Sequence, residues 1–101
     1  MIEHINDQKE FKESIKEGLV LIDFFATWCG PCKMLSPVIE QLATEHPELK
    51  VVKVDVDEAP EIAIPYQVQA IPTLLLMKEG KLVNRGMGYM NKNQLENFIS
   101  K

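Results

Sequence analysis

The sequence predicts an α/β fold with a central mixed sheet, and three features of its hydrophobic pattern lead to this class. Residues 19–25 form a short apolar run, which is typical of a buried strand, and the valine-rich residues 50–56 predict a second strand. Residues 31–45 lie between them and carry apolar side chains at helical spacing, as in a parallel βαβ unit. Residues 73–77 and 81–85 flank a turn that contains glycine and predict an antiparallel hairpin. A parallel half joined to an antiparallel half makes the sheet mixed.

The first two helices have start and stop signals of their own. Asp7 can cap a helix, with Glu10 as its capping-box partner, and Gly18 is expected to end that helix. The second helix covers about residues 31–45. Pro37 lies inside it and is expected to kink it, because proline removes one backbone hydrogen bond.

Two further helices complete the predicted order. A short helix is expected over about residues 61–66, after the second strand. Asn91 and Gln94 are spaced as a capping box, which predicts a final helix with an apolar inner face. The predicted order is α-β-α-β-α-β-β-α, without repeats or linkers.

Composition limits the function classes. The chain has 101 residues with 46% hydrophobic and 26% charged side chains, which predicts one domain, residues 1–101, with a real core. The net charge of −4 argues against nucleic acid as a partner. No apolar run approaches the ~20 residues of a membrane span. Residues 1–7 are acidic where a signal peptide would be basic, so we expect a cytoplasmic protein, and a monomer.

The only two cysteines, Cys29 and Cys32, lie three positions apart at the predicted start of the second helix. One helical turn places them within the ~4.4–6.8 Å Cα separation that a disulfide needs. A structural staple is the first alternative, but so short a loop contributes only about 2 kcal/mol. A zinc site is the second; it needs about four ligands, and His4 and His46 are isolated. Redox chemistry is therefore the favoured interpretation.

The chain resembles the thioredoxin family over essentially its full length. The resemblance is carried by DFFATWCGPCK at 23–33, VDVD at 54–57, AIPTLLL at 70–76, and Gly88. It implies the thioredoxin fold, a mixed sheet of about four to five strands flanked by four helices. It also implies a protein thiol-disulfide oxidoreductase with no bound cofactor beyond a redox-active Cys29–Cys32 disulfide. The expected activity is reduction of disulfides in oxidised client proteins, with re-reduction by an NADPH-dependent flavoprotein thioredoxin reductase.

The positions of the cysteines predict their roles. Cys29 stands at the exposed helix start, where the helix dipole and free N–H groups favour a thiolate, so it is the expected attacking thiol. Cys32 lies one turn further in, is expected to be more shielded, and suits the resolving role. Gly30 leaves room for the backbone of a client. Pro31 offers neither charge nor N–H donor to the thiolate, which favours a reductant.

Asp23 is a carboxylate in an otherwise apolar strand. Burial would raise the pKa of this carboxyl and make it a candidate proton acceptor for Cys32, through water if needed. The alternative is an exposed aspartate at a strand end. The resemblance implies the buried interpretation, and it places Lys53 near Asp23 as a possible supporting residue. A lysine on a solvated face is the alternative for Lys53.

The resemblance also implies a client-binding surface around Cys29. A cis Ile71–Pro72 bond would face the cysteines, with the Ile71 backbone free to pair with an extended client segment; an ordinary trans proline is the alternative. Trp28, Ala70, Ile71 and Gly88 would complete this surface, although Trp28 alone could belong to the core. Two rival functions stay open: an oxidase or isomerase on the same fold, and a non-catalytic binding module.

Overall fold

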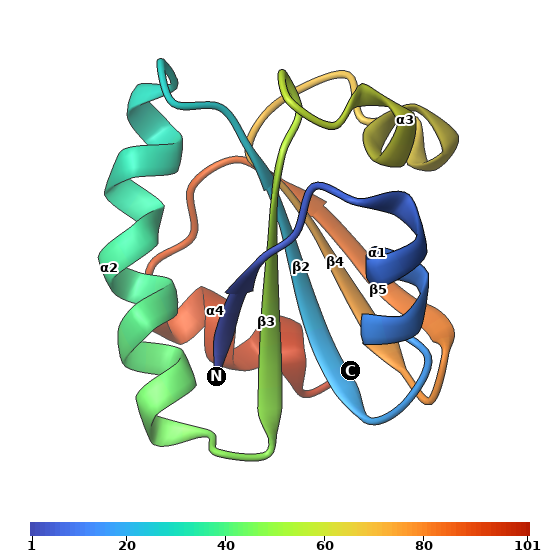
Figure 1. Cartoon of the computed structure of the whole chain (residues 1–101). Helices are drawn as coiled ribbons and strands as arrows, with labels where there is room; N and C mark the ends of the chain where they lie inside the picture. Colours follow the sequence, from blue (N-terminus) through green and yellow to red (C-terminus); the bar gives the residue numbers. More distant parts are fainter.

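Five strands form one mixed sheet in the order β1-β3-β2-β4-β5 (Figure 1). The structure is a computed structural model and describes residues 1–101. The strands are β1 (Ile2–His4), β2 (Leu19–Phe25), β3 (Leu49–Asp55), β4 (Thr73–Lys78) and β5 (Lys81–Met87). The helices are α1 (Gln8–Ser14), α2 (Gly30–Glu45), α3 (Pro60–Ala63) and α4 (Lys92–Ile99), and the 3-10 turn η1 (Ile64–Tyr66) follows α3. Strands β1, β3 and β2 are parallel, whereas β4 and β5 are antiparallel to their neighbours.

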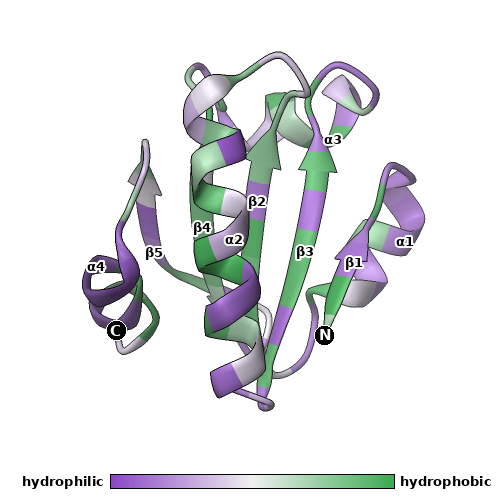
Figure 2. Ribbon diagram, turned by 90° about the vertical axis from the view of Figure 1, so that its left-hand side faces the viewer, coloured by the Kyte–Doolittle hydropathy of each residue, from purple (hydrophilic) through white to green (hydrophobic).

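Side-chain alternation along the central strand β2 divides the molecule into two faces. Val20, Ile22 and Phe24 point to one face, where α1 and α3 pack. Leu21 points to the other face, against α2 and α4. Asp23 stands two positions after Leu21 and therefore lies on the α2 face as well. Figures 1 and 2 show this layering, with α2 lying across one side of the sheet.

Each face carries its own hydrophobic core, and the central strands β2 and β4 between them are largely hydrophobic (Figure 2). The α1–α3 side includes Phe11, Ile62 and Leu75. The α2–α4 side includes Ile39, Leu74 and Leu95. Continuous burial of β2 and β4 follows from cores on both faces, which explains why these strands are apolar at nearly every position.

Strand β1 is the one element that the sequence pattern does not reveal. It has three residues and pairs only with β3, at the edge of the sheet. Its length gives no measurable alternation, so its formation depends on the neighbouring strand. The Met1 carbonyl accepts from the Val51 N–H at 2.8 Å, and the Ile5 N–H donates to the Lys53 carbonyl at 3.0 Å.

The helix ends agree with the predictions in part. The Asp7 side chain caps α1 by accepting from the Glu10 N–H at 2.8 Å, whereas the reciprocal bond of a capping box forms only between Asn91 and Gln94 at α4. Helix α1 ends at Ser14, so the prediction that Gly18 ends it is wrong. Gly18 has φ +75° and serves the turn into β2 instead. Helix α2 begins at Gly30 and continues through Pro37.

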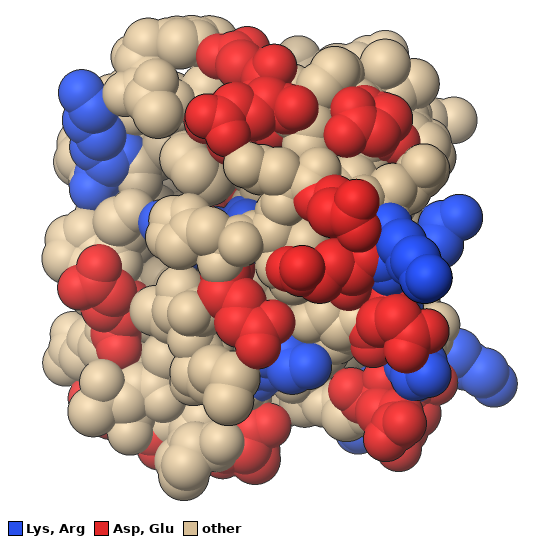
Figure 3. Space-filling model, viewed as in Figure 1, with Lys and Arg blue, Asp and Glu red and all other residues tan.

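Acidic side chains are spread over the face seen in Figure 3, with many lysine and arginine side chains gathered along one edge. None of the helices combines the length and the apolar character that crossing a bilayer requires.

Candidate thiol-disulfide site

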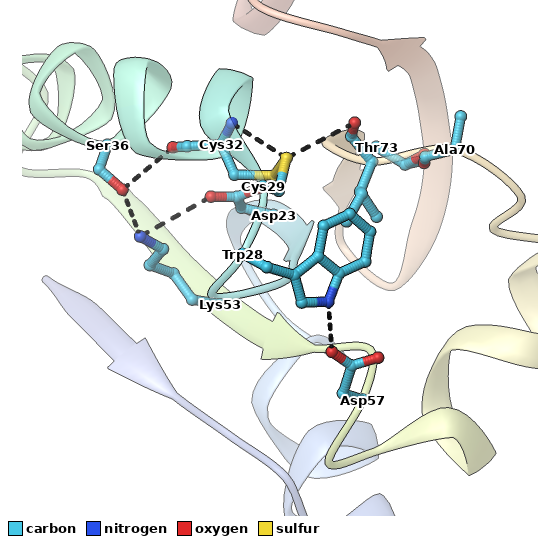
Figure 4. Close-up of a disulfide and its surroundings, with 10 residues drawn as sticks. Asp23, Trp28, Cys29, Cys32, Ser36, Lys53, Asp57, Ala70 and Thr73 are labelled. Carbon is cyan, nitrogen blue, oxygen red and sulfur yellow. Dashed lines mark hydrogen bonds and ion pairs between the residues drawn. A yellow bond between two sulfur atoms is a disulfide. The ribbon is translucent and has the colours of Figure 1, made fainter.

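The two cysteines form a disulfide at the start of α2, with their Cα atoms 5.3 Å apart (Figure 4). The buried strand β2 leads directly to this point, and Cys29 is the N-cap residue of the helix. Gly30 and Pro31 follow in the first turn, where proline is tolerated because no helical bond needs its missing N–H. No cluster of three or more histidine, cysteine, aspartate or glutamate side chains is placed to hold a metal.

Hydrogen bonding makes the two sulfurs unequal. The Cys32 N–H donates to the Cys29 Sγ at 3.2 Å, so this sulfur takes the place of the usual capping oxygen at a helix N-terminus. The same N–H and the helix dipole would stabilise a Cys29 thiolate after reduction. Exposure does not distinguish the residues: Cys29 is 5% and Cys32 4% exposed. The expectation of a more exposed Cys29 is thus wrong for the disulfide form.

A loop before β4 lies against the Cys29 side of the disulfide. The Ile71–Pro72 bond is cis, and the Ile71 carbonyl oxygen is 3.8 Å from the Cys29 Sγ. The Thr73 hydroxyl donates to the Ala70 carbonyl at 2.5 Å, which fixes the loop. The Gly88 N–H donates to the Pro72 carbonyl at 2.8 Å. The structure therefore brings Ala70, Ile71, Pro72 and Gly88 together beside Cys29.

Trp28 lies on the surface next to the disulfide rather than in the core. Its side chain is 69% exposed, and its indole N–H donates to an Asp57 carboxylate oxygen at 2.8 Å (Figure 4). Asp55 shapes the loop that carries Asp57 by accepting from the Asp57 and Glu58 N–H groups. Asp57 belongs to the VDVD segment that carries the family resemblance, but no local pattern indicates that its carboxylate accepts from Trp28.

Asp23 is buried, which excludes the interpretation of an exposed strand end. It is 1% exposed, and its Oδ1 has no hydrogen-bond partner. Its Oδ2 lies 3.9 Å from the Nζ of Lys53, its neighbour in register on β3. Burial raises the pKa of the Asp23 carboxyl to about 6, and the nearby Lys53 charge opposes this shift.

Lys53 is not a solvated surface lysine, because only 11% of its side chain is exposed. Its Nζ donates to the Ser36 Oγ at 2.9 Å and lies 5.1 Å from the centre of the Phe25 ring. A pocket of about 220 Å³ reaches these side chains and Cys32, large enough for water. The one signal for Ser36 in the sequence is its position four residues after Cys32, which places both on one helix face.

Fold and site together define a class of protein: a small α/β protein that can switch between a dithiol and a disulfide at a helix N-terminus. The family model described as thioredoxin matches residues 2–101. The thioredoxin of Chlamydia trachomatis is 55% identical over 94 residues, which cover 93% of this chain and 92% of that protein. The thioredoxin of Listeria monocytogenes is 48% identical over 102 residues, covering 100% and 98% of the two chains.

Solved structures agree with the sequence relatives. Oxidised mitochondrial thioredoxin 3 of Saccharomyces cerevisiae superposes with a TM-score of 0.90 at 42% identity, covering 98% of this chain and 93% of that chain. A chain from work on the thiol-resolving mechanism of yeast mitochondrial 1-Cys peroxiredoxin gives 0.91 at 41% identity, with the same coverage. The chain belongs to the thioredoxin family. It is a thiol-disulfide oxidoreductase with a redox-active Cys29–Cys32 pair.

Proposed function

We propose that this protein works as a reductant of disulfide bonds in client proteins, within the cytoplasm and as a single-domain monomer. The observation that carries the proposal is the Cys32 N–H aimed at the Cys29 Sγ at the start of α2. It stabilises a thiolate at one sulfur only, which gives the two cysteines separate roles.

The reaction takes two exchange steps. The Cys29 thiolate attacks one sulfur of a client disulfide; the client S–S bond breaks, a mixed disulfide forms, and the other client sulfur leaves as a thiolate. Cys32 then passes its thiol proton to Asp23 and attacks the Cys29 sulfur. The Cys29–Cys32 bond forms, the mixed disulfide breaks, and the second client thiolate leaves. The client gains two electrons, which the dithiol loses.

The residues between the cysteines support the reducing direction. Pro31 has no N–H and no charge to stabilise the thiolate further. The space beside Gly30 is open, because a Cβ added there would meet no atom within 4 Å. A weakly stabilised thiolate means that the disulfide resists reduction and the dithiol is the stronger reductant. Each turnover leaves the Cys29–Cys32 disulfide. A flavoprotein thioredoxin reductase that draws on NADPH is the proposed source of the two electrons that reopen it.

The surface beside Cys29 suits an extended client segment. Trp28 supplies an exposed apolar face, and Ala70 is exposed next to it in the loop before β4. The Ile71 backbone is the proposed pairing partner for that client segment, and Gly88, which bonds to Pro72, has open space where a side chain would stand. Asp23, with Lys53 beside it, is the proposed proton acceptor for Cys32.

Reduction of insulin tests the proposal. The reduced B chain precipitates, so turbidity reports the reaction. We expect turbidity with NADPH, a flavoprotein thioredoxin reductase and this protein, and with dithiothreitol in place of the reductase. Cys29→Ser should abolish both, whereas Lys12→Ala, an exposed change on α1, should abolish neither. Binding of oxidised insulin without release of its thiols would instead identify a non-catalytic binding module.

A further inference from the structure

The Ser36 hydroxyl is held between two partners on the α2 face of the sheet (Figure 4). Its Oγ donates to the Cys32 carbonyl at 3.4 Å and accepts from the Lys53 Nζ at 2.9 Å. A hydroxyl has one proton and two lone pairs. Because the Ser36 proton is used in the bond to the Cys32 carbonyl, a lone pair on its Oγ is available to accept from Lys53. The ammonium of Lys53 is thereby tied to α2, one turn after the resolving cysteine.

The position of this ammonium matters because Asp23 has no other charged neighbour. Lys53 of β3 faces it at 3.9 Å, too far for a hydrogen bond, and the Asp23 Oδ1 has no partner at all. On the other side β4 places Leu74 opposite Asp23. Helix α2 contributes Cys32 and the exposed Lys33, which both line the pocket that Lys53 and Ser36 also reach.

We infer that Ser36 is a positioning residue of the exchange site, which holds the Lys53 ammonium off the Asp23 carboxylate and so keeps that carboxylate available to take the Cys32 proton. This inference rests on the proposed function. The step that it serves is the resolving one. The proton leaves the Cys32 sulfur for an Asp23 oxygen, and the Cys32 thiolate that remains breaks the mixed disulfide.

A full ion pair would weaken Asp23 as a base. Without the Ser36 oxygen, the Asp23 carboxylate, whose Oδ2 lies 3.9 Å away, is the acceptor toward which the largely buried Lys53 ammonium would turn. At an effective dielectric constant of about 20, closing the gap from 3.9 Å to a hydrogen bond of about 2.8 Å corresponds to about one pKa unit. The Asp23 carboxyl would then titrate at a lower pH and take the Cys32 proton less readily near neutrality.

Titration of the Asp23 carboxyl carbon by ¹³C NMR tests the positioning directly, in the disulfide form and without any client. Ser36→Ala should lower the Asp23 midpoint by about one pH unit, and Ser36→Thr, which keeps the hydroxyl, should leave it in place. Thr44→Ala is the matched control, because the Thr44 hydroxyl makes the same bond to the carbonyl four residues earlier without a lysine partner. Alanine favours helix, so the variants should fold.

A double variant makes the test specific. In a Lys53→Gln background, Ser36→Ala should no longer move the Asp23 midpoint, because no ammonium is left to redirect. An Asp23 midpoint that stays in place or rises in Ser36→Ala would overturn the inference. So would an equal fall in Ser36→Thr, or a fall that persists without Lys53.

Kinetics with 5,5′-dithiobis(2-nitrobenzoate) connect the positioning to the reaction. The reduced protein releases one coloured thiolate when Cys29 attacks and a second when Cys32 resolves. Ser36→Ala should slow the second release several-fold at pH 7 and shift its acid limb to lower pH, while the first release is unchanged. If the second release keeps the parent rate and pH profile although the NMR midpoint moves, the inference fails at the chemical step. If no variant, nor the parent, releases the second thiolate, the proposed function fails instead.

Discussion

The surroundings of Asp23 disfavour the ionised form of its carboxyl group. It is surrounded by the apolar core on β2, has one oxygen without a partner, and has its only counter-charge at 3.9 Å. Such a group lowers the stability of the fold, and a strongly perturbed pKa of this kind is typical of functional sites. The cost itself can be measured.

Stability should therefore fall as the pH rises through the Asp23 titration. The pKa of Asp23 is raised from 3.8 to about 6 in the folded chain, so between these values the folded chain keeps a proton that the unfolded chain has lost. The loss begins above about pH 4 and is complete above about pH 6; the difference corresponds to about 3 kcal/mol. Asp23→Asn should remove this dependence, and be more stable than the parent at pH 7.5 by up to about that amount.

Urea denaturation at pH 4 and pH 7.5 measures the effect. The matched control is Asp7→Asn, a change at an exposed helix cap where both residues are favoured, which should follow the parent curve. An Asp23→Asn variant that is less stable than the parent at pH 7.5 would show that the carboxylate makes a favourable structural contact.

The cysteines should differ in what their loss leaves behind. Cys32→Ser keeps the attacking thiolate but removes the resolving thiol, so mixed disulfides with an oxidised client should accumulate. Cys29→Ser removes the sulfur that accepts the Cys32 N–H and should form no such adducts. Intact-mass spectrometry after mixing with oxidised insulin distinguishes them. Stable adducts through Cys32 in the Cys29→Ser variant would reverse the assignment.

Among the elements, α2 carries the site and β5 with α4 closes the core beneath it. Helix α4 packs Leu95, Phe98 and Ile99 inward on the α2 face. This contact is close because β5 places Gly86 under the helix. A Cβ at Gly86 would lie 2.7 Å from the Met90 Cε and 3.0 Å from the Phe98 Cε1.

Gly86→Ala should therefore destabilise the fold by about 1 kcal/mol or more, because α4 must shift or Phe98 must leave its preferred position. Val83→Ala, at an exposed position on the same strand, is the control and should change the unfolding free energy by less than about 0.5 kcal/mol. Thermal or urea denaturation of both variants gives the comparison. If Gly86→Ala and the parent have the same free energy of unfolding, α4 and Phe98 can accommodate the added methyl group without loss of stability.

The whole molecule consists of two cores separated by one sheet. Ile62 of α3 and Ile39 of α2 lie almost fully buried on opposite faces. Ile62→Val and Ile39→Val should each cost about 0.5–1.5 kcal/mol. In the double variant the costs should add within about 0.5 kcal/mol, because the two side chains share no partners.

One unfolding transition is expected in every case, since both cores include side chains of β2, β3 and β4. Urea denaturation followed both by tryptophan fluorescence and by far-UV circular dichroism checks this. Two separate transitions would show that the faces unfold independently.

Much of this protein is determined by its sequence alone. Local signals include the apolar runs of β2 and β4, the valines of β3, the helical stripe of α2 and the caps at Asp7 and Asn91. Each element formed where its signal lies. The cysteine spacing at a helix start likewise predicted the redox pair. These predictions succeed because the interactions behind them, such as helix capping and side-chain periodicity, join residues that are close together in the sequence.

Only the tertiary structure decided the rest. The three residues of β1 become a strand because β3 offers them hydrogen bonds. Asp23 is buried because cores form on both faces of β2, and its partner Lys53 comes from a different strand. The Ser36 hydroxyl reaches Lys53 only once α2 packs on the sheet, and Asp57 reaches Trp28 only once its loop lies beside the disulfide. These contacts join residues 17 to 49 positions apart in the sequence, so no local pattern reveals them before the chain folds.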